Sequence, residues 1–143
     1  MSGIIFAIIA GAAMSIQGVF NTRVSEKIGL YESNTLVALI SLIVSVIVMA
    51  FLRKGDFSAL GSVNKLYLTG GIIGVIITIT VMLAIGKTSP TVATSVILIA
   101  QLAVAALIDM FGLFGAEKVS FHITKLLGLA LMIGGIVVFK LKG

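Results

Sequence analysis

Residues 96–115, "VILIAQLAVAALIDMFGLFG", form a long apolar run that contains one amide and one carboxylate. These are Gln101 and Asp109, in a chain of 143 residues of which only 10% are charged. A polar group in hydrocarbon costs several kcal/mol when it has no hydrogen-bond partner. We therefore expect Gln101, near the middle of the run, to face protein, a partner chain or water.

The composition of the whole chain indicates a membrane protein. The sequence is 59% apolar with a single proline, and its mean hydropathy is +1.28, well outside the balance of a soluble domain. Short charged clusters separate four uncharged intervals, each close to the roughly 20 residues that cross a bilayer. A fifth interval, residues 126–139, has only 14 residues, but the flanking Lys125 and Lys140 can reach the headgroups and lengthen the span.

We predict an all-α membrane protein with one transmembrane domain, residues 1–143, and five transmembrane helices. The predicted helices are approximately 3–22, 33–52, 66–86, 90–111 and 121–140. The first helix is expected to be retained, because the N-terminus lacks the basic region and cleavage site of a signal peptide.

The sequence argues against several kinds of chemistry. It contains no cysteine, and its one histidine, His122, has no second ligand at metal spacing, so we expect no metal site and no cofactor. It has no nucleophile with an adjacent base and no phosphate-binding loop, which argues against an enzyme. The basic residues are spread over every loop, so we expect contacts with lipid phosphates and no nucleic-acid partner.

The ten basic residues divide evenly between the two sides of the five predicted helices. Five lie on the side of the N-terminus: Arg53, Lys54, Lys65, Lys118 and Lys125. The other five are Arg23, Lys27, Lys87, Lys140 and Lys142. The more basic side of a membrane protein stays cytoplasmic, so a chain without a bias is expected to insert in both orientations. We predict an antiparallel dimer, formed by two copies or with an oppositely oriented homologue.

The alternative topology has four spans, with the last segment not crossing. Lys140 and Lys142 would then change sides, and the basic residues would divide seven against three. Such a chain would have one fixed orientation. The fifth segment therefore decides the topology.

Small residues form stripes along the first and third predicted helices. Helix association in lipid depends on close approach at such residues, so we predict that these positions pack tightly. Direct contact with substrate is the alternative for the glycines. The predicted packing positions are Gly11, Ser15, Gly18, Gly70, Gly71 and Gly74.

The predicted substrate-binding residues are Gln17, Asn21 and Gln101. Gln17 and Asn21 are four residues apart and point the same way from the first helix. These amides either bond between helices or line a polar cavity. Asp109 is the only carboxylate inside a predicted span, and such residues have functional roles by default. It either couples transport to protons or binds substrate, or it anchors a helix end through a loop lysine or the backbone amides of a neighbouring helix end.

Four segments together resemble the YdcZ-like family of small bacterial membrane proteins, within the drug/metabolite transporter superfamily. They are "GAAMSIQGVFNTRVS" at 11–25, "GGIIG" at 70–74, "AQLAVAALIDMFGLFG" at 100–115 and "KLLGLALMIGG" at 125–135. The resemblance covers nearly the whole chain, and it places Gln17, Asn21, Gln101 and Asp109 at the family's polar positions. The chain departs from the family pattern at Ala100, where glycine is usual, and at Met110, where histidine is usual.

The resemblance implies five helices equivalent to half of a ten-helix transporter, completed by dimerisation in the bacterial inner membrane. We expect a secondary transporter of a small metabolite or other small solute, with its site at the interface of the antiparallel dimer. Small multidrug transporters use a first-helix glutamate to exchange protons for cations, whereas Gln17 cannot titrate, so a neutral solute is favoured. A small dual-topology ion channel and a membrane scaffold that transports nothing are the alternatives.

Overall fold

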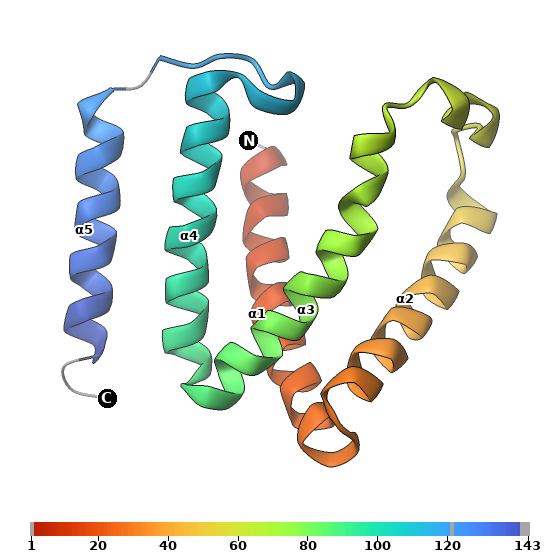
Figure 1. The fold of residues 1–143 in the computed structure, drawn as a ribbon, viewed down its shortest axis with the longest axis horizontal. Coiled ribbons are helices and arrows are strands. Elements are labelled where there is room, and N and C mark those ends of the chain that lie inside the picture. Colours follow the sequence, from red (N-terminus) through yellow and green to blue (C-terminus); the bar gives the residue numbers. More distant parts are fainter. Residues whose placement is uncertain (1, 121, 141–143) are drawn as a thin grey trace. The chain divides into compact units, whose positions relative to one another are not determined.

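The computed structural model describes residues 2–120 and 122–140, and within these ranges the chain is helical and contains no β-strand (Figure 1). The predicted all-α class is confirmed. The predicted start of the last helix at residue 121, and Lys142, lie outside the described residues. The α-helices are α1 (Ser2–Ile28), α2 (Leu30–Leu52), α3 (Gly70–Lys87), α4 (Pro90–Phe111) and α5 (Ile123–Lys140). Short 3₁₀-helices are η1 (Phe57–Ser62), η2 (Lys65–Thr69) and η3 (Leu113–Gly115).

Four helical segments are long and apolar enough to cross a membrane: Ser2–Ile28, Leu30–Leu52, Lys65–Lys87 and Pro90–Phe111. The apolar part of α5 is shorter. Little of these surfaces is covered within the chain, and none of the most apolar window of α2 is buried. Such extensive exposed apolar surface requires lipid or another chain to cover it.

The first helix is longer than the predicted interval, which ended at residue 22. Arg23 and Glu26 continue α1 and form an ion pair of 3.1 Å one turn apart. Charged residues end the lipid-embedded part of a helix but not the helix itself, because they have ordinary helix propensity. The helix ends only at Gly29, which has a φ of 103°. Glycine adopts such a positive φ readily because it has no Cβ atom.

Gly29 makes the sharp turn that sends α2 back along α1. Its amide donates to the Ser25 carbonyl oxygen and its own carbonyl accepts from the Ser33 amide, both at 3.0 Å. A Cβ atom at this position would collide with the Glu32 carboxylate. The two helices are therefore joined by one residue that carries no side chain.

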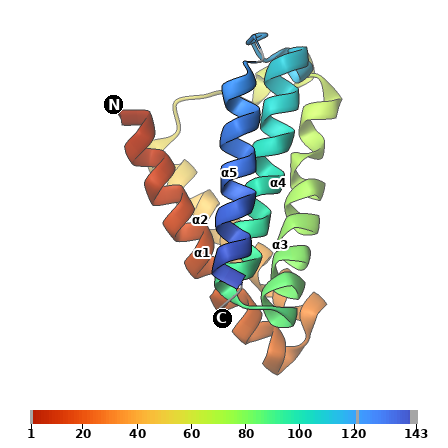
Figure 2. The ribbon, with the colours of Figure 1, turned by 90° about the vertical axis from the view of Figure 1, so that its left-hand side faces the viewer.

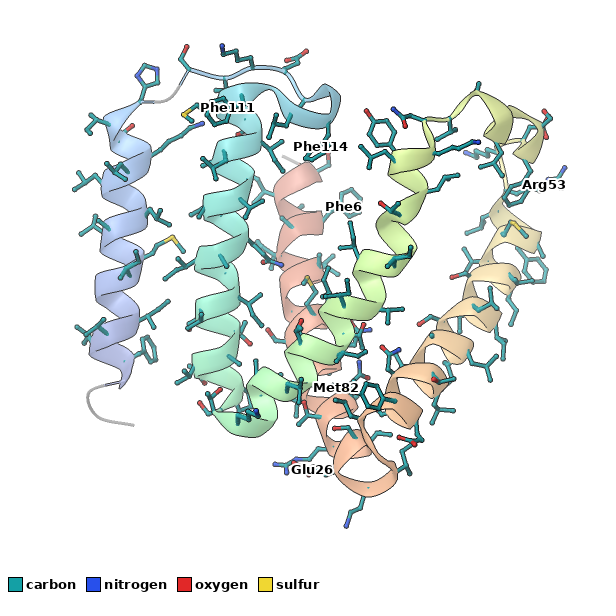
Figure 3. The ribbon with its side chains drawn as sticks, in the orientation of Figure 1. Phe6, Glu26, Arg53, Met82, Phe111 and Phe114 are labelled. Carbon is teal, nitrogen blue, oxygen red and sulfur yellow. The ribbon has the colours of Figure 1, made fainter. Side chains whose placement is uncertain are left out.

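The chain forms two compact units, Met1–Lys87 and Thr88–Gly143. In the first unit, α1, α2 and α3 contact one another, and the buried core lies near the α1–α2 turn. Met82 of α3 is 2% exposed and Ser33 of α2 is fully buried. Figure 3 shows Met82 toward the turn end of this unit, whereas Phe6 and Arg53 lie toward the opposite end. The helices of this unit therefore pack tightly at only one end.

The core of the first unit is partly polar. The Ser33 hydroxyl donates to the backbone carbonyl oxygen of Asn21 at 3.2 Å, and Thr22 donates to the Gly18 carbonyl oxygen at 2.7 Å. Each hydroxyl thus bonds to a backbone oxygen in the core, which removes the cost of burying it.

The 3₁₀-helices between α2 and α3 are capped by side chains at their first turns. Asp56 begins η1 and accepts from the hydroxyl and the backbone amide of Ser58. These bonds favour the charged carboxylate and lower the pKa of Asp56 below its ordinary value. Asn64 caps η2 by accepting from the Leu66 amide at 3.0 Å.

The second unit is a hairpin of two helices. Ser89 caps α4 by accepting from the Val92 amide at 3.3 Å, and Pro90 occupies the first turn, where its missing amide costs nothing. Gly112 ends α4 with φ 64°, and the Val119 amide returns to bond the Asp109 carbonyl oxygen at 2.9 Å. α5 then runs back beside α4 in the opposite direction (Figures 1 and 2).

Candidate functional site

A cleft with a volume of about 370 Å³ lies in the first unit, between α2 and α3 with a contribution from α1. Gln17, one of the predicted substrate-binding residues, lines it. The other polar side chains in its wall are those of Asn34, Ser41, Ser45 and Thr78, and the remaining lining residues are Val37, Ala38, Leu42, Gly71, Gly74 and Val75. The cleft thus combines amides and hydroxyls with an apolar and glycine wall.

The α2 wall of the cleft is a stripe that the sequence analysis missed. Asn34, Ala38, Ser41 and Ser45 follow one another at spacings of four, three and four residues, which places them on one face of the helix. This spacing of small and polar residues, in a span that is otherwise apolar, is the signal that could have identified them. Ser41 is the twelfth of the 23 residues of α2, so the stripe crosses the middle of the span.

The α3 wall consists of Gly71, Gly74, Val75 and Thr78. A Cβ atom on either glycine would meet no other heavy atom of the chain within 4 Å, so the backbone is exposed to the cleft. The Thr78 hydroxyl donates to the Gly74 carbonyl oxygen at 2.9 Å. Its oxygen keeps acceptor capacity toward the cleft. A ligand can therefore approach the α3 backbone closely.

The cleft is polar without being charged. Its lining contains no Asp, Glu, Lys, Arg or His, so it offers hydrogen-bond donors and acceptors but no counter-ion. The side chains of Gln17, Ser41 and Ser45 are exposed in the single chain. At this depth in a bilayer such groups need a bonding partner, which a solute, water or a second chain can supply.

The three predicted substrate-binding amides occupy different environments. Gln17 lines the cleft, whereas Asn21, one turn later, is 8% exposed in the core of the first unit and does not line the cleft. Its backbone oxygen accepts the Ser33 bond described above. Gln101 belongs to the second unit, where it is exposed on α4 and is not part of the cleft between α4 and α5. Within the first unit, Gln17 and Asn21 thus lie in different surroundings, and the binding role of all three amides stays a prediction.

Asp109 lies beside Lys125 in the second unit. The Lys125 Nζ is 3.9 Å from Oδ2 of Asp109, and both side chains are partly exposed. Lys125 is in the first turn of α5, so the pair links the end of α4 to the start of α5. Lys125 is thus within ion-pair distance of Asp109, and both the anchoring role and the coupling role stay predictions.

Only one of the predicted packing glycines has close contacts inside the chain. A Cβ atom on Gly18 would lie 2.8 Å from Cδ1 of Ile85 and 3.1 Å from Cγ1 of Val81. Gly11, Gly70, Gly71 and Gly74 would meet nothing within 4 Å, and Ser15 bonds to the Gly11 carbonyl oxygen at 3.2 Å. Close packing at these other positions remains a prediction.

Metal binding finds no support in the parts of the chain that the structure describes. Within residues 2–120 and 122–140, no three His, Cys, Asp or Glu side chains are grouped so that they could share a metal ion. Any function of the cleft in the first unit therefore rests on its amides, hydroxyls and backbone.

The comparison with protein families decides the class of the chain. A family model described as "Putative inner membrane exporter, YdcZ" matches residues 2–138. The chain belongs to the YdcZ family. The resemblance seen in the sequence is therefore confirmed. No curated protein and no solved structure is significantly similar to this YdcZ chain.

Family membership and hydropathy together give the location. The YdcZ family is described as one of inner membrane exporters, and four helical segments of the chain have the length and apolar character of membrane spans. The YdcZ chain is a multi-pass protein of the inner membrane, and its class is membrane transport.

Proposed function

We propose that the protein is a secondary transporter of a small, neutral, hydrogen-bonding solute, and that the cleft of the first unit forms half of the substrate site. A second, oppositely oriented chain supplies the other half. The second chain is a copy of the first or an oppositely oriented homologue.

The observation that carries this proposal is an uncharged polar surface at the middle of apolar helices. Gln17, Ser41 and Ser45 offer amide and hydroxyl groups to the cleft, which no charged residue lines. Transporter sites typically lie near the bilayer midplane, where a few placed polar groups orient the solute. An ion would need a counter-charge at this depth, so the wall favours a neutral molecule.

The need for a second chain follows from the polar side chains and glycine backbone that the single chain leaves uncovered. Three of the cleft's polar side chains, those of Gln17, Ser41 and Ser45, are exposed, and Gly11 and Gly70 present bare backbone to open space. Close approach of another helix at these glycines would shield the cleft from lipid. The even division of basic residues favours an antiparallel arrangement, whose two-fold axis in the membrane plane matches that of inverted-repeat transporters.

The hairpin of α4 and α5 supports five crossings. The two helices lie side by side in opposite directions (Figures 1 and 2). The 18 residues of α5 extend about 27 Å, close to the thickness of a hydrocarbon core. Because α5 runs back along α4 over nearly the thickness of the hydrocarbon core, we expect α5 to cross the bilayer. It would then be the fifth crossing of the chain.

The test is solute counterflow in liposomes that contain the purified full-length protein. Vesicles are loaded with an unlabelled neutral solute, and uptake of the labelled solute is followed across a panel that includes charged analogues of similar size. A carrier takes up the labelled solute faster when the unlabelled solute is present inside the vesicle, because its binding site then reorients to the outside with solute bound. Uptake without this stimulation, together with ionic current, would indicate a channel. No flux of any solute would favour a scaffold.

A matched pair of glycine variants tests whether the cleft is the route. Gly74→Val adds a side chain to the cleft wall, whereas Gly3→Val adds the same side chain near the start of α1, outside the lining and outside the predicted packing positions. Neither new Cβ atom meets another heavy atom of the neighbouring elements within 4 Å. We expect Gly74→Val to abolish counterflow at an unchanged dimer yield and Gly3→Val to leave counterflow unchanged. Equal loss of counterflow in both variants would show that the effect does not depend on the cleft.

A further inference from the structure

A second cleft, between α4 and α5, has an amphiphilic wall that the proposed transport site does not use. Its volume is about 470 Å³. Asp109 and Lys125 lie at one end of it, and Leu102 and Met132 at the other. The two helices run in opposite directions, so the end of α4 lies beside the start of α5. The lining residues of both helices therefore change from charged to apolar from the same end of the cleft.

The charged end lies at the level of the headgroups. Asp109 is two residues before the end of α4, and Lys125 is the third residue of α5. The seven residues from Asp109 back to Leu102, and from Lys125 on to Met132, each extend about 10 Å along a helix. The cleft thus reaches from the membrane surface about a third of the way into a hydrocarbon core about 30 Å thick.

The ion pair at this end is open. The Lys125 Nζ is 3.9 Å from Oδ2 of Asp109, beyond the 2.7 to 2.9 Å that is typical of a charge-assisted hydrogen bond. The side chains are 36% and 46% exposed, respectively. Each charge therefore retains room for a second partner of opposite sign.

We propose that this cleft binds a phospholipid with a primary-amine, zwitterionic headgroup of the phosphatidylethanolamine type. The lipid phosphate accepts hydrogen bonds from the Lys125 ammonium, and the lipid ammonium donates to the Asp109 carboxylate. One acyl chain lies along the apolar wall between Ala105 and Leu129. The two fixed charges of the protein thus match the two charges of the headgroup.

The order of groups along the cleft favours a lipid over a helix of another protein. A charged end leads into an apolar wall, in which Ala106 and Gly128 are the small residues. A phospholipid has the same order of groups, because its charged headgroup is followed by apolar acyl chains.

The headgroup preference distinguishes this site from general lipid contact. Phosphatidylcholine has the same two charges, but its quaternary ammonium has no N–H to donate to Asp109. Phosphatidylglycerol has the phosphate but no cation. Both lipids offer the same acyl chains to the apolar wall, so only the contact of the lipid amine with Asp109 separates them from phosphatidylethanolamine.

The experiment is native mass spectrometry of the full-length protein with the three lipids, matched in their acyl chains. We expect about fivefold greater retention of phosphatidylethanolamine than of phosphatidylcholine per chain, the factor that about 1 kcal/mol from one hydrogen bond gives. Retention is counted in monomer and dimer peaks separately, so a change in assembly does not obscure it. Equal retention of the two zwitterionic lipids would overturn the proposal.

Variants separate the headgroup contact from the apolar wall. Asp109→Asn should remove the preference for phosphatidylethanolamine, and the exchanged pair Asp109→Lys with Lys125→Asp should restore part of it. Lys125→Gln removes the contact with the phosphate and should therefore reduce the retention of all three lipids. Gly128→Leu fills the cleft without meeting another heavy atom at its Cβ, and should reduce retention of all three lipids. Unchanged retention in Gly128→Leu would place the bound lipid elsewhere.

Two controls address other sources of the same charges. Lys54→Gln removes a lysine from the loop after α2, outside this cleft, and should leave the preference unchanged. Water-soluble phosphoethanolamine carries the headgroup charges without a chain, and should not displace the lipid at equal concentration. Displacement by phosphoethanolamine, or an equal loss of preference in Lys54→Gln, would contradict a lipid site in this cleft.

Discussion

Gly18 of α1 and Ile85 of α3 are in close contact where these two helices of the first unit pack. A Cβ atom on Gly18 would lie 2.8 Å from Cδ1 of Ile85, a distance that real Cβ contacts do not reach. Thr22, one turn later, is buried beside them and bonds to the Gly18 carbonyl oxygen. The absence of a side chain at residue 18 therefore sets how closely α1 and α3 pack.

This contact predicts different effects for two glycines of the same helix. Gly18→Leu should separate α1 from α3 and destabilise the folded chain by about 1 to 3 kcal/mol, the usual cost of overpacking. Gly11→Leu meets nothing within 4 Å inside the chain, so it should change the stability of the monomer little. Denaturant unfolding of the monomer in detergent measures both.

The same two variants also test the dimer. If Gly11 packs against a second chain, as the stripe of small residues predicts, Gly11→Leu should lower the dimer fraction while the monomer remains folded. A normal dimer fraction would remove Gly11 from the interface. Destabilisation of the monomer by Gly11→Leu equal to that by Gly18→Leu would contradict the packing of the first unit.

Hydropathy and charge clusters are enough to predict the all-helical class and four of the apolar helices, because apolar length and charge position are properties of sequence alone. The charged residues gave the end of the lipid-embedded segment but not the end of α1, which Gly29 terminates six residues later. A prediction from hydropathy cannot see this difference, since it depends on backbone conformation.

The candidate site was predicted only in part. An amide in an apolar span, such as Gln17, is conspicuous in the sequence, whereas Ser41 and Ser45 are less conspicuous because small hydroxyl residues are common in membrane helices. Asn21 shares the direction of Gln17 along α1, yet the neighbouring α2 turn buries it. Spacing along one helix gives the direction of a side chain, but the neighbouring helices decide what that side chain meets.

The amides provide a second prediction. Gln17→Leu should abolish solute counterflow and leave the dimer intact, because Leu removes hydrogen bonding from an exposed wall position without leaving a buried group unpaired. Gln17→Asn keeps a shorter amide and should retain part of the transport. Loss of the dimer in Gln17→Leu would instead indicate that the amide bonds between chains.

Gln101 allows the same test on α4. The side chain is exposed in the single chain, and an exposed amide in a lipid-facing segment needs a partner. We expect Gln101→Leu to abolish counterflow at a normal dimer yield, as for a residue that lines the shared site. Reduced dimer recovery on gel filtration, with transport lost only in proportion, would assign Gln101 to packing between chains.

The third prediction concerns orientation. The basic residues divide equally between the two sides, so a reporter fused to the C-terminus should be active on both sides of the membrane. Adding three lysines at the C-terminus should shift most chains to one orientation. A reporter seen on one side only in the unmodified chain would refute dual insertion of this chain and leave an oppositely oriented homologue as its partner.

The last prediction concerns the pair of Asp109 and Lys125. Asp109→Asn keeps the shape and hydrogen-bonding capacity of the side chain but removes its charge. If the pair anchors α4 to α5, this change should weaken the hairpin by about 0.2 to 1 kcal/mol, the usual value of a partly exposed ion pair, and lower the amount of intact dimer. Lys125→Gln should have a similar effect, and the double variant should be little worse than either single one, because both remove the same contact.

Residual transport should keep the pH dependence of the unmodified protein, which counterflow measured across a pH series would establish. A normal dimer yield together with loss of that pH dependence would reverse the assignment, because a residue that only anchors a helix end has no part in proton coupling, whereas a carrier of protons must titrate as the site changes sides.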